Sequence, residues 1–313
     1  MRSGTPARMA ALCAAGMITL AGCGGGSGGS TGVSVVTGVY PLEWLATQIG
    51  GEHVDVMNLT EPGAEPHDLE LTPRQIGRVS SSDIAFHISG LQPAVDEAIE
   101  QEGGENALDV ADLVELRPAN DTGEHTEDGE HGHEEDHDHG AADPHMWLDT
   151  ARMEKIATAL ADRLGQVDPD HADDYRTNAD QVVSELAEIG ALYTEGLAEC
   201  ESRDMVVSHS AFGYLADEFE LNQISVSGID PDTEPSPARM AEVADLVEEH
   251  EVTTIFTETL TSPKVAETIA EETGAATAVL DPLEGITDQS PGDDYPTVMR
   301  GNLEALQTAL RCS

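Results

Sequence analysis

Three histidines and one aspartate have the residue types and the sequence surroundings of a metal site: His67, His145, His209 and Asp281. Two of them directly follow predicted strands, one lies just beyond a strand, and one precedes a predicted helix. Side chains at the carboxyl ends of parallel strands line the crevice where open α/β sheets bind ligands. Each histidine alone would more often be structural. Together, two residues from each half of the chain offer three nitrogens and one oxygen, a tetrahedral set that suits zinc.

The imidazole nitrogens decide which ions such a site would take. Nitrogen ligands select against calcium and magnesium, which prefer oxygen. Copper is not excluded, because it binds to nearly any such site more tightly than zinc does. Histidines bind metal as neutral bases, so we expect the affinity to fall as the pH drops toward the free-histidine pKa of about 6.5.

A second group of histidines lies in residues 121–140, which read DTGEHTEDGEHGHEEDHDHG. The segment contains nine acids and five histidines: His125, His131, His133, His137 and His139. It has no aliphatic residue, so it cannot build a core and predicts a disordered loop. An ordinary acidic loop would explain the acids but not the histidines, so we interpret it as an auxiliary, low-affinity metal collector.

The elements that must position the four candidate ligands alternate between strand and helix. Strands are predicted at 33–37, 54–59, 84–88, 205–208, 223–226, 252–257 and 276–280. Helices are predicted at 41–50, from Thr72-Pro73 onward, and at 211–220, 237–249 and 263–272. This alternation predicts an α/β protein with parallel sheets covered by helices.

A long stretch without an internal proline separates the two halves. From Pro169 to Ala198 it carries apolar residues at helical spacing, which predicts one long helix joining two α/β lobes. We therefore expect an N-terminal lobe at 33–168, a connecting helix at 169–199 and a C-terminal lobe at 200–313. The ligand site is expected in the cleft between the lobes.

The N-terminus predicts export and lipid anchoring. Arg2 and Arg8 precede an apolar run that is too short to span a membrane. The run ends in Leu-Ala-Gly-Cys, which resembles a lipobox, followed by a Gly/Ser-rich tether. We expect a signal peptide at 1–22, lipidation of Cys23, a tether at 23–32, and a mature protein anchored to the outer face of the cell membrane.

Two cysteines remain free to pair in the exported part, Cys200 and Cys312, because Cys13 lies in the predicted signal peptide and Cys23 is expected to be lipidated. Thiols oxidise outside the membrane, so an even pair predicts a disulfide. It would tie the C-terminus to the start of the second half.

The charge of the chain excludes several partners. There are 14 Lys+Arg against 61 Asp+Glu among 313 residues, a formal net charge of −47. Nucleic acid and anionic membrane surfaces are therefore excluded. The acids are spread over the whole length, which indicates a solvated acidic surface suited to a salty or divalent-rich milieu.

Five segments resemble the metal-binding solute-binding proteins of ATP-binding-cassette importers, and particularly the zinc-uptake lipoprotein branch of that family. They are PHDLELTPRQ (66–75), DPHMWLD (143–149), SHSAFGYLADEFEL (208–221), IFTETLTSPKVAETIAEETGA (255–275) and VLDPL (279–283). They occur in the family's order, over about residues 33–310.

The resemblance implies two (β/α)4-type lobes joined by a rigid long helix, with the metal buried between them. It implies that His67, His145 and His209 are ligands, with Asp281 as the fourth. Manganese-preferring relatives commonly have a carboxylate where this chain has His209, so zinc is favoured over manganese. The implied function is capture of Zn²⁺ by a monomer and delivery to an ATP-binding-cassette permease with its ATPase.

Two other classes of function remain open. A zinc hydrolase also uses three histidines, with Glu258 as a candidate base, but there is no HExxH motif and a fourth protein ligand would close the site to water. We therefore do not expect an enzyme. A surface zinc buffer or adhesin would instead act through residues 121–140, and deleting them would abolish its function.

Overall fold

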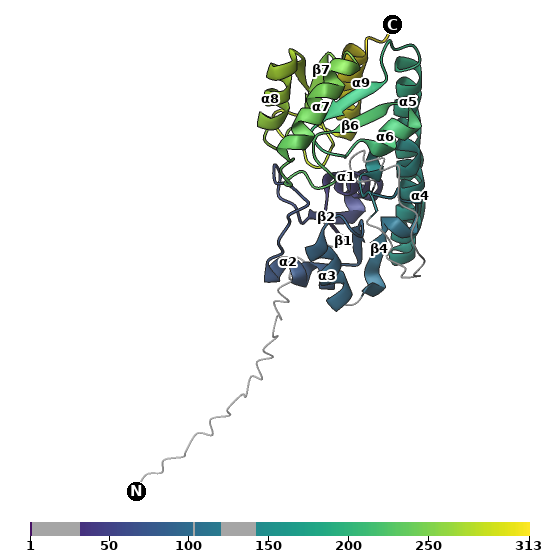
Figure 1. The fold of residues 1–313 in the computed structure, drawn as a ribbon. Coiled ribbons are helices and arrows are strands. Elements are labelled where there is room, and N and C mark those ends of the chain that lie inside the picture. The colour runs from purple at the N-terminus through teal and green to yellow at the C-terminus, as the bar shows by residue number, and fades with distance from the viewer. Residues whose placement is uncertain (2–31, 103, 120–141) are drawn as a thin grey trace, which may run out of the picture. The chain divides into compact units, whose positions relative to one another are not determined.

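Two parallel four-stranded sheets, one in each half of the chain, form the framework (Figure 1). The first has the order β2-β1-β3-β4 and the second the order β6-β5-β7-β8. Their strands are β1 (Val33–Thr37), β2 (Val54–Asn58), β3 (Ile84–His87), β4 (Ala107–Asp109), β5 (Asp204–Val207), β6 (Asn222–Ser225), β7 (Thr254–Thr257) and β8 (Ala276–Val279). We call each sheet with its helices a lobe, and the predicted α/β class is confirmed.

The computed structural model describes Met1 and residues 32–102, 104–119 and 142–313. Residues Thr31–Ser313 form one compact unit. The predicted signal peptide, Cys23, the tether and the His-rich segment 121–140 lie outside the described residues, apart from Met1 and Gly32. Among the described helices, none is long and apolar enough to cross a membrane.

Helices connect the strands within each lobe. They are α1 (Tyr40–Gly50), α2 (Pro73–Ser81), α3 (Pro93–Glu102), α4 (Thr150–Val167), α5 (Ala172–Gly196), α6 (Gly213–Glu218), α7 (Pro237–Glu249), α8 (Lys264–Thr273) and α9 (Tyr295–Leu310). The predicted start of α2 is confirmed in detail: Thr72 and Gln75 form a capping box, and Pro73 occupies the first turn.

The predicted long helix is α5, which follows a short 3₁₀ turn at Pro169–His171. It packs along α4 and contacts α1 of the N-terminal lobe and α9 of the C-terminal lobe (Figure 1). The Asn178 side chain donates to the Ile49 carbonyl (3.0 Å), and the Tyr193 hydroxyl donates to the Met299 carbonyl (2.7 Å). These bonds attach the helix to both lobes.

The largest hydrophobic cluster continues from one lobe into the other. It contains Phe86 of β3, Phe256 of β7 and Tyr193 of α5, all buried. Trp44 and Tyr295 stack within it, with ring centroids 4.8 Å apart. A shared core resists rotation of the lobes against each other, because rotation would expose apolar surface.

Cys200 and Cys312 are bonded to each other, as the sequence predicted. The disulfide joins the segment after α5 to Cys312, two positions beyond the end of α9, over a sequence separation of 112. It therefore holds the last helix of the chain against the start of the C-terminal lobe.

Candidate metal centre

Four side chains converge between the lobes: His67, His145, His209 and Glu284. Each offers one ligand atom, and these atoms all lie within 4.8 Å of one another. The first two come from the N-terminal half, in the β2–α2 connection and before α4. The other two come from the connections after β5 and β8. The structure thus brings together all three histidines that the sequence singled out.

The carboxylate of Glu284 faces all three imidazoles. Its Oε1 atom lies 3.4 Å from Nε2 of His67, 3.1 Å from Nε2 of His145 and 3.3 Å from Nε2 of His209. The side chains of His145, His209 and Glu284 are 0% exposed. Three ring nitrogens and one carboxylate oxygen therefore point at a single buried position.

Asp281, predicted as the fourth member of the set, is not in this group. Its carboxylate accepts hydrogen bonds from the backbone N–H of Leu283 (2.8 Å) and the hydroxyl of Thr259 (3.3 Å). Leu283 adopts a left-handed backbone conformation, φ 62°. Asp281 thus stabilises the turn that carries Glu284 inward, and Glu284, rather than Asp281, lies in the group of four.

The sequence held a signal for this correction. Pro282 and Gly285 flank the region, and both residue types mark turns. Because the chain turns soon after β8, Glu284 lies at the crevice and Asp281 does not. Distinguishing the two carboxylates required the turn geometry, which spacing does not reveal.

Hydrogen bonds across the lobes hold His145 against the segment of Glu284. Trp147 Nε1 donates to the Pro282 carbonyl (2.7 Å), and the Tyr295 hydroxyl donates to the Trp147 carbonyl (2.6 Å). Gln92, a buried side chain, donates to the Pro66 carbonyl (3.0 Å) and thereby fixes the loop that carries His67.

Two buried carboxylates orient the rings of two histidines. Asp143 Oδ1 lies 2.8 Å from His145 Nδ1, and Glu258 Oε2 lies 2.7 Å from His209 Nδ1. A carboxylate on Nδ1 keeps the proton there and leaves Nε2 free as a lone-pair donor, which is the common arrangement around metal-binding histidines. Glu258, considered above as a catalytic base, is occupied in this supporting contact.

The buried histidines and carboxylates of the pocket shift one another's pKa values. Burial lowers the pKa of His145, but hydrogen bonds to Asp143 and Glu284 raise it overall. Burial likewise opposes ionisation of His209, yet the charges of Glu258 and Glu284 raise its pKa well above the usual value. For Glu284, burial is outweighed by His209 and by hydrogen bonds from the histidines, which hold its pKa well below the usual range.

A fourth carboxyl group belongs to the same pocket. Burial and the charge of Glu284 raise the pKa of Glu65 to about 8. Its Oε1 atom accepts from the backbone N–H of His67 at 3.1 Å. No sequence pattern distinguished Glu65 from the other acids of this loop.

Within the described part of the chain, three buried polar atoms of the pocket have no hydrogen-bond partner: His209 Nε2, Glu284 Oε2 and Glu65 Oε2. Unpaired buried polar atoms are costly and rare in folded proteins. A cation held among the four clustered ligand atoms would satisfy the lone pair of His209 Nε2. The donor set of imidazoles and carboxylate fits a borderline divalent metal ion.

The described residues on either side of the His-rich segment 121–140 are joined to each other. Pro118 and Ala142 form an antiparallel bridge, and the N–H of Asp143 donates to the Arg117 carbonyl (2.8 Å). The Tyr214 hydroxyl, from α6, accepts from the Arg117 N–H (2.7 Å) and donates to the Asp143 carbonyl (2.6 Å). Asp143, which takes part in this junction, is two positions before His145 in the sequence.

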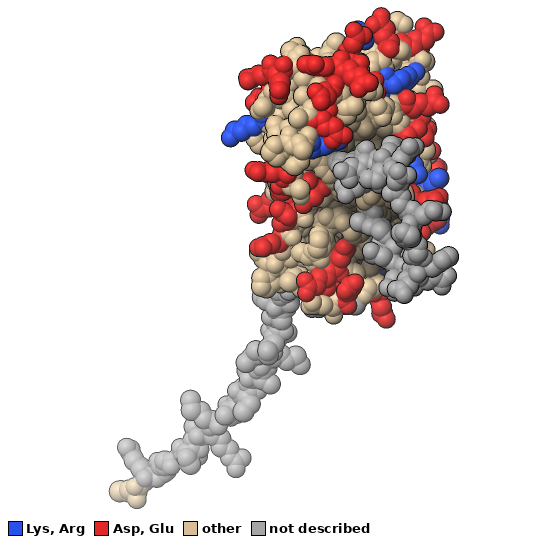
Figure 2. All heavy atoms as spheres, viewed as in Figure 1, with Lys and Arg blue, Asp and Glu red and all other residues tan. Residues whose placement is uncertain are grey.

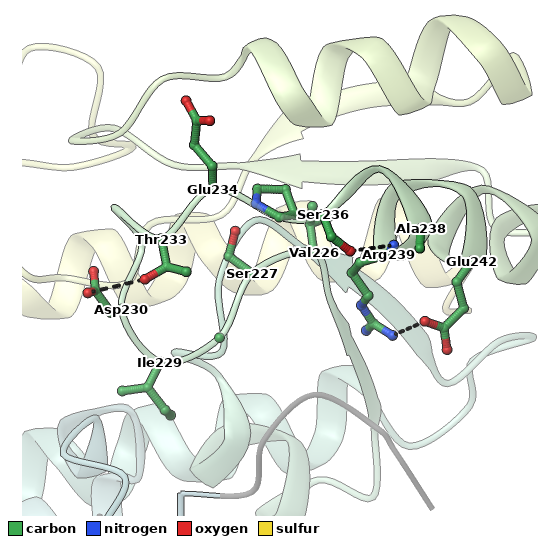
Figure 3. Close-up of a pocket in the computed structure, with 12 residues that line it drawn as sticks. Val226, Ser227, Ile229, Asp230, Thr233, Glu234, Ser236, Ala238, Arg239 and Glu242 are labelled. Atoms are coloured by element: carbon green, nitrogen blue, oxygen red, sulfur yellow. Dashed lines mark hydrogen bonds and ion pairs between the residues drawn. The ribbon is translucent and has the colours of Figure 1, made fainter.

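A separate surface pocket of about 520 Å³ lies on the C-terminal lobe, between the loop after β6 and the first turns of α7 (Figure 3). Its lining includes none of the four clustered residues. The guanidinium of Arg239 is already paired with Glu242 (3.0 Å) and donates to the Ser225 carbonyl (2.6 Å). We assign the chemistry to the buried centre, where unpaired donors converge, and not to this pocket.

Known proteins resemble this chain over most of its length. The family model described as zinc-uptake complex component A periplasmic (ZnuA) matches residues 35–309. The high-affinity zinc uptake system protein ZnuA of Bacillus subtilis is 34% identical over 313 residues, covering 96% of both chains. The zinc-binding lipoprotein AdcA of Streptococcus pneumoniae is 30% identical over 306 residues, or 96% of this chain.

The AdcA relatives are longer proteins. This chain covers 59% of the S. pneumoniae protein and 55% of the Streptococcus pyogenes zinc-binding protein AdcA, so it spans about half the length of these relatives.

Among solved structures, the laminin-binding protein Lmb of Streptococcus agalactiae is similar, with a TM-score of 0.76 and 30% identity. The match covers 89% of this chain and all of that one, which is described as bifunctional, with adhesin and metal-transporting activity. The metal-dependent lipoprotein YcdH of B. subtilis gives a TM-score of 0.72 at 31% identity, covering 89% of this chain and 99% of that one. With two such sheets, the long helix and the family match along most of the sequence, this chain belongs to the ZnuA family.

Proposed function

We propose that this protein captures zinc outside the cytoplasm and delivers it to an ATP-binding-cassette permease. The observation that carries the proposal is the buried group of His67, His145, His209 and Glu284, with unpaired lone-pair atoms facing one position. Three neutral imidazoles and one carboxylate are a closed tetrahedral set for Zn²⁺. The names of the ZnuA and AdcA relatives support zinc as the cargo.

Capture follows from the chemistry of these ligands. Asp143 and Glu258 hold the Nδ1 protons, so the Nε2 atoms of His145 and His209 bind the ion. Glu284 lowers the net charge of the loaded site and completes it. Calcium and magnesium are rejected because they prefer all-oxygen shells.

We propose the following division of the chain. Residues 1–22 are a signal peptide, Cys23 carries lipid, and 23–32 form a tether to the outer face of the membrane. The lobes at 33–168 and 200–313 hold the ion between them, with 169–199 as their connection. A shared core and attachment of α5 to both lobes favour local loop adjustments over wide closure. The soluble part acts as a monomer with its permease and ATPase.

Residues 121–140 act as an auxiliary collector under metal scarcity. Their five histidines offer ligands, and the flanking residues Pro118 and Ala142 are paired close in sequence to His145. A second candidate function is a surface zinc buffer or adhesin that works through this segment. Support for an adhesin comes from the similar protein Lmb, which is described as having adhesin activity as well as metal-transporting activity.

One titration separates the two candidates. Residues 24–313 without 121–140 are titrated with zinc beside the same chain carrying His67→Ala, and His250→Ala serves as a control because His250 lies outside the site. The transport proposal expects one tight zinc that His67→Ala removes and His250→Ala leaves in place. Loss of tight binding on deleting 121–140 alone would contradict it and support the buffer or adhesin.

A further inference from the structure

A network of side chains outside the metal centre reaches Asp143, the carboxylate that orients His145. Asp143 is buried, and its Oδ1 atom accepts from the backbone N–H of His145 (3.0 Å) and lies 2.8 Å from the ring Nδ1. The other carboxylate oxygen, Oδ2, accepts from the guanidinium of Arg117 at 3.4 Å. The orientation of His145 therefore depends on what holds Asp143 in place.

Tyr214 holds Asp143 from the opposite lobe. It is 1% exposed and belongs to α6, five positions after His209 in the sequence. Its hydroxyl donates to the Asp143 carbonyl (2.6 Å) and accepts from the backbone N–H of Arg117 (2.7 Å). The segment that follows His209 is thereby bonded to the segment that carries His145.

Helix α6 also holds the side chain of Arg117. The Cζ atoms of Arg117 and Arg152 lie 5.5 Å and 4.9 Å from the centroid of the Tyr214 ring, within the range of cation–π contacts. Asp217 of the same helix pairs with Nε of Arg117 at 2.7 Å. An added Cβ at Gly213 would collide with Nη1 of Arg117, so glycine leaves the space that the guanidinium occupies. The backbone and the guanidinium of Arg117 are thus both fixed by α6.

We infer that Tyr214 is a positioning residue of the metal centre, which acts through the carboxylate of Asp143 to keep Nε2 of His145 directed at the ion. The inference rests on the proposed function of zinc capture and adds a residue that lies outside the group of four. Through one hydroxyl, the histidine of the C-terminal lobe and the histidine of the N-terminal lobe are tied to a common junction.

The physical reason is the cost of ordering a ligand. A carboxylate on Nδ1 fixes the tautomer and the orientation of a metal-binding imidazole, and losing such a partner weakens metal binding by about 10–100-fold. Without the Tyr214 hydroxyl, the Asp143 carbonyl loses a hydrogen bond, and Asp143 samples positions from which it does not hold the ring of His145. Ordering Asp143 again when the ion binds costs free energy, so the zinc affinity falls.

The test is the zinc affinity of a Tyr214→Phe variant, measured by competition against a chelator at a temperature where the protein is folded. Phenylalanine keeps the ring beside both guanidinium groups and removes only the hydroxyl. We expect the affinity to fall by about fivefold. Tyr193→Phe is the matched control, because the buried Tyr193 hydroxyl also donates to a backbone carbonyl, that of Met299 (2.7 Å), but lies outside this network. It should bind zinc as wild type does.

A double-mutant cycle tests the route by which the hydroxyl acts. In an Asp143→Ala background there is no carboxylate to position, so Tyr214→Phe should lower the affinity by less than about twofold. If thermal unfolding shows that Asp143→Ala does not fold, Asp143→Asn takes its place. The amide keeps the shape of the side chain but not its charge, so the loss caused by Tyr214→Phe should again be smaller than in wild type.

Three results would overturn the inference. A zinc affinity of Tyr214→Phe equal to that of wild type would show that His145 is oriented without the hydroxyl. An equal loss with and without the Asp143 carboxylate would mean that the hydroxyl acts by another route. The same loss in Tyr193→Phe would make it a general effect of removing a buried hydrogen bond. If the wild-type protein showed no zinc binding that His67→Ala removes, the proposed function would fail instead, and the wild-type titration reveals that without any Tyr214 variant.

Discussion

At the scale of single residues, the site depends on carboxylates that never need to touch the ion. Glu258 accepts from both the backbone N–H (3.1 Å) and the ring of His209 (2.7 Å). Glu258 therefore fixes both the position of His209 and the tautomer of its ring. Asp143 makes the same pair of contacts with His145, at 3.0 Å and 2.8 Å. Each lobe thus contains its own histidine–carboxylate pair.

Replacing Glu258 by Gln should weaken zinc binding by about 10–100-fold, because the amide no longer holds the proton on Nδ1 with a full charge. Competition against a chelator of known affinity measures the loss. Glu249→Gln, an exposed acid at the end of α7, should bind as wild type does. Unchanged affinity in Glu258→Gln would show that His209 is oriented without this contact.

Protons and zinc should compete for the same nitrogens. The pKa values of His145 and His209 are raised in the metal-free protein by their carboxylate partners. Bound protons therefore stabilise the metal-free fold fully below the free-histidine pKa of about 6.5, and this stabilisation is lost as the pH rises through the raised values. Zinc binds only when both rings are neutral, so the stabilisation of the fold by zinc increases as the pH rises.

The expected outcome is a larger zinc-induced rise in Tm at about pH 8 than at about pH 6, with net proton release on binding. Thermal unfolding at both pH values, and calorimetry in buffers of different ionisation enthalpy, check this. A zinc-induced shift that is independent of pH would contradict the assignment of the imidazoles as ligands.

At the scale of elements, helix packing decides which residues a position tolerates. Gly301 lies within α9, where a Cβ atom would come 2.6 Å from Cβ and 3.1 Å from Cγ of Pro291. The proline ring is rigid, so it cannot rotate away. Gly77 lies within α2, where an added Cβ would meet nothing within 4 Å. Both glycines lie within helices, but only Gly301 is packed closely against another residue.

Alanine should therefore have opposite effects at these positions. Gly77→Ala should raise the free energy of unfolding by about 0.5–1 kcal/mol, the usual gain of replacing a helical glycine. Gly301→Ala should lower it by about 1–3 kcal/mol, because the added methyl group overpacks the contact with Pro291. Denaturant unfolding of the zinc-free protein measures both, and a gain in Gly301→Ala would show that α9 shifts freely from Pro291.

At the scale of the whole molecule, charge is the dominant property. On the face seen in Figure 2, acidic side chains are spread over the described parts of both lobes, with few basic ones between them. The formal net charge of −47 comes from 61 acids against 14 Lys+Arg. Such an excess keeps a protein soluble but destabilises the compact state through self-repulsion.

Salt should therefore stabilise this protein. The Debye length falls from about 30 Å at 0.01 M to about 3 Å at 1 M ionic strength, so repulsion between exposed carboxylates is largely screened at the higher value. We expect the Tm of the zinc-free protein to rise steadily with KCl over this range. Calorimetric or fluorescence-detected melting tests it, and a Tm that is constant or falls with salt would contradict the acidic-shell interpretation.

The sequence by itself determined the elements and most of the donors. Strand β1 and helix α7 lie where their patterns predicted, because apolar periodicity and caps act locally. Helices α3 and α9 and the short strand β4 were not predicted. The start of α9 nevertheless carries a local signal, a capping box between Asp294 and Thr297. Of the three histidines, His209 was predicted from its position directly after a strand, His67 from its position just beyond one, and His145 from its position before a helix.

Only the tertiary structure decided what completes the centre. Asp281 and Glu284 are both acids of one short segment, and a left-handed Leu283 turns one of them away from the histidines and the other toward them. Glu65 differs from Glu61, an exposed acid of the same loop, in being half-buried with a buried Oε2 atom. Convergence of residues more than two hundred positions apart is set by the packing of two lobes on one core, and no local pattern encodes that distance.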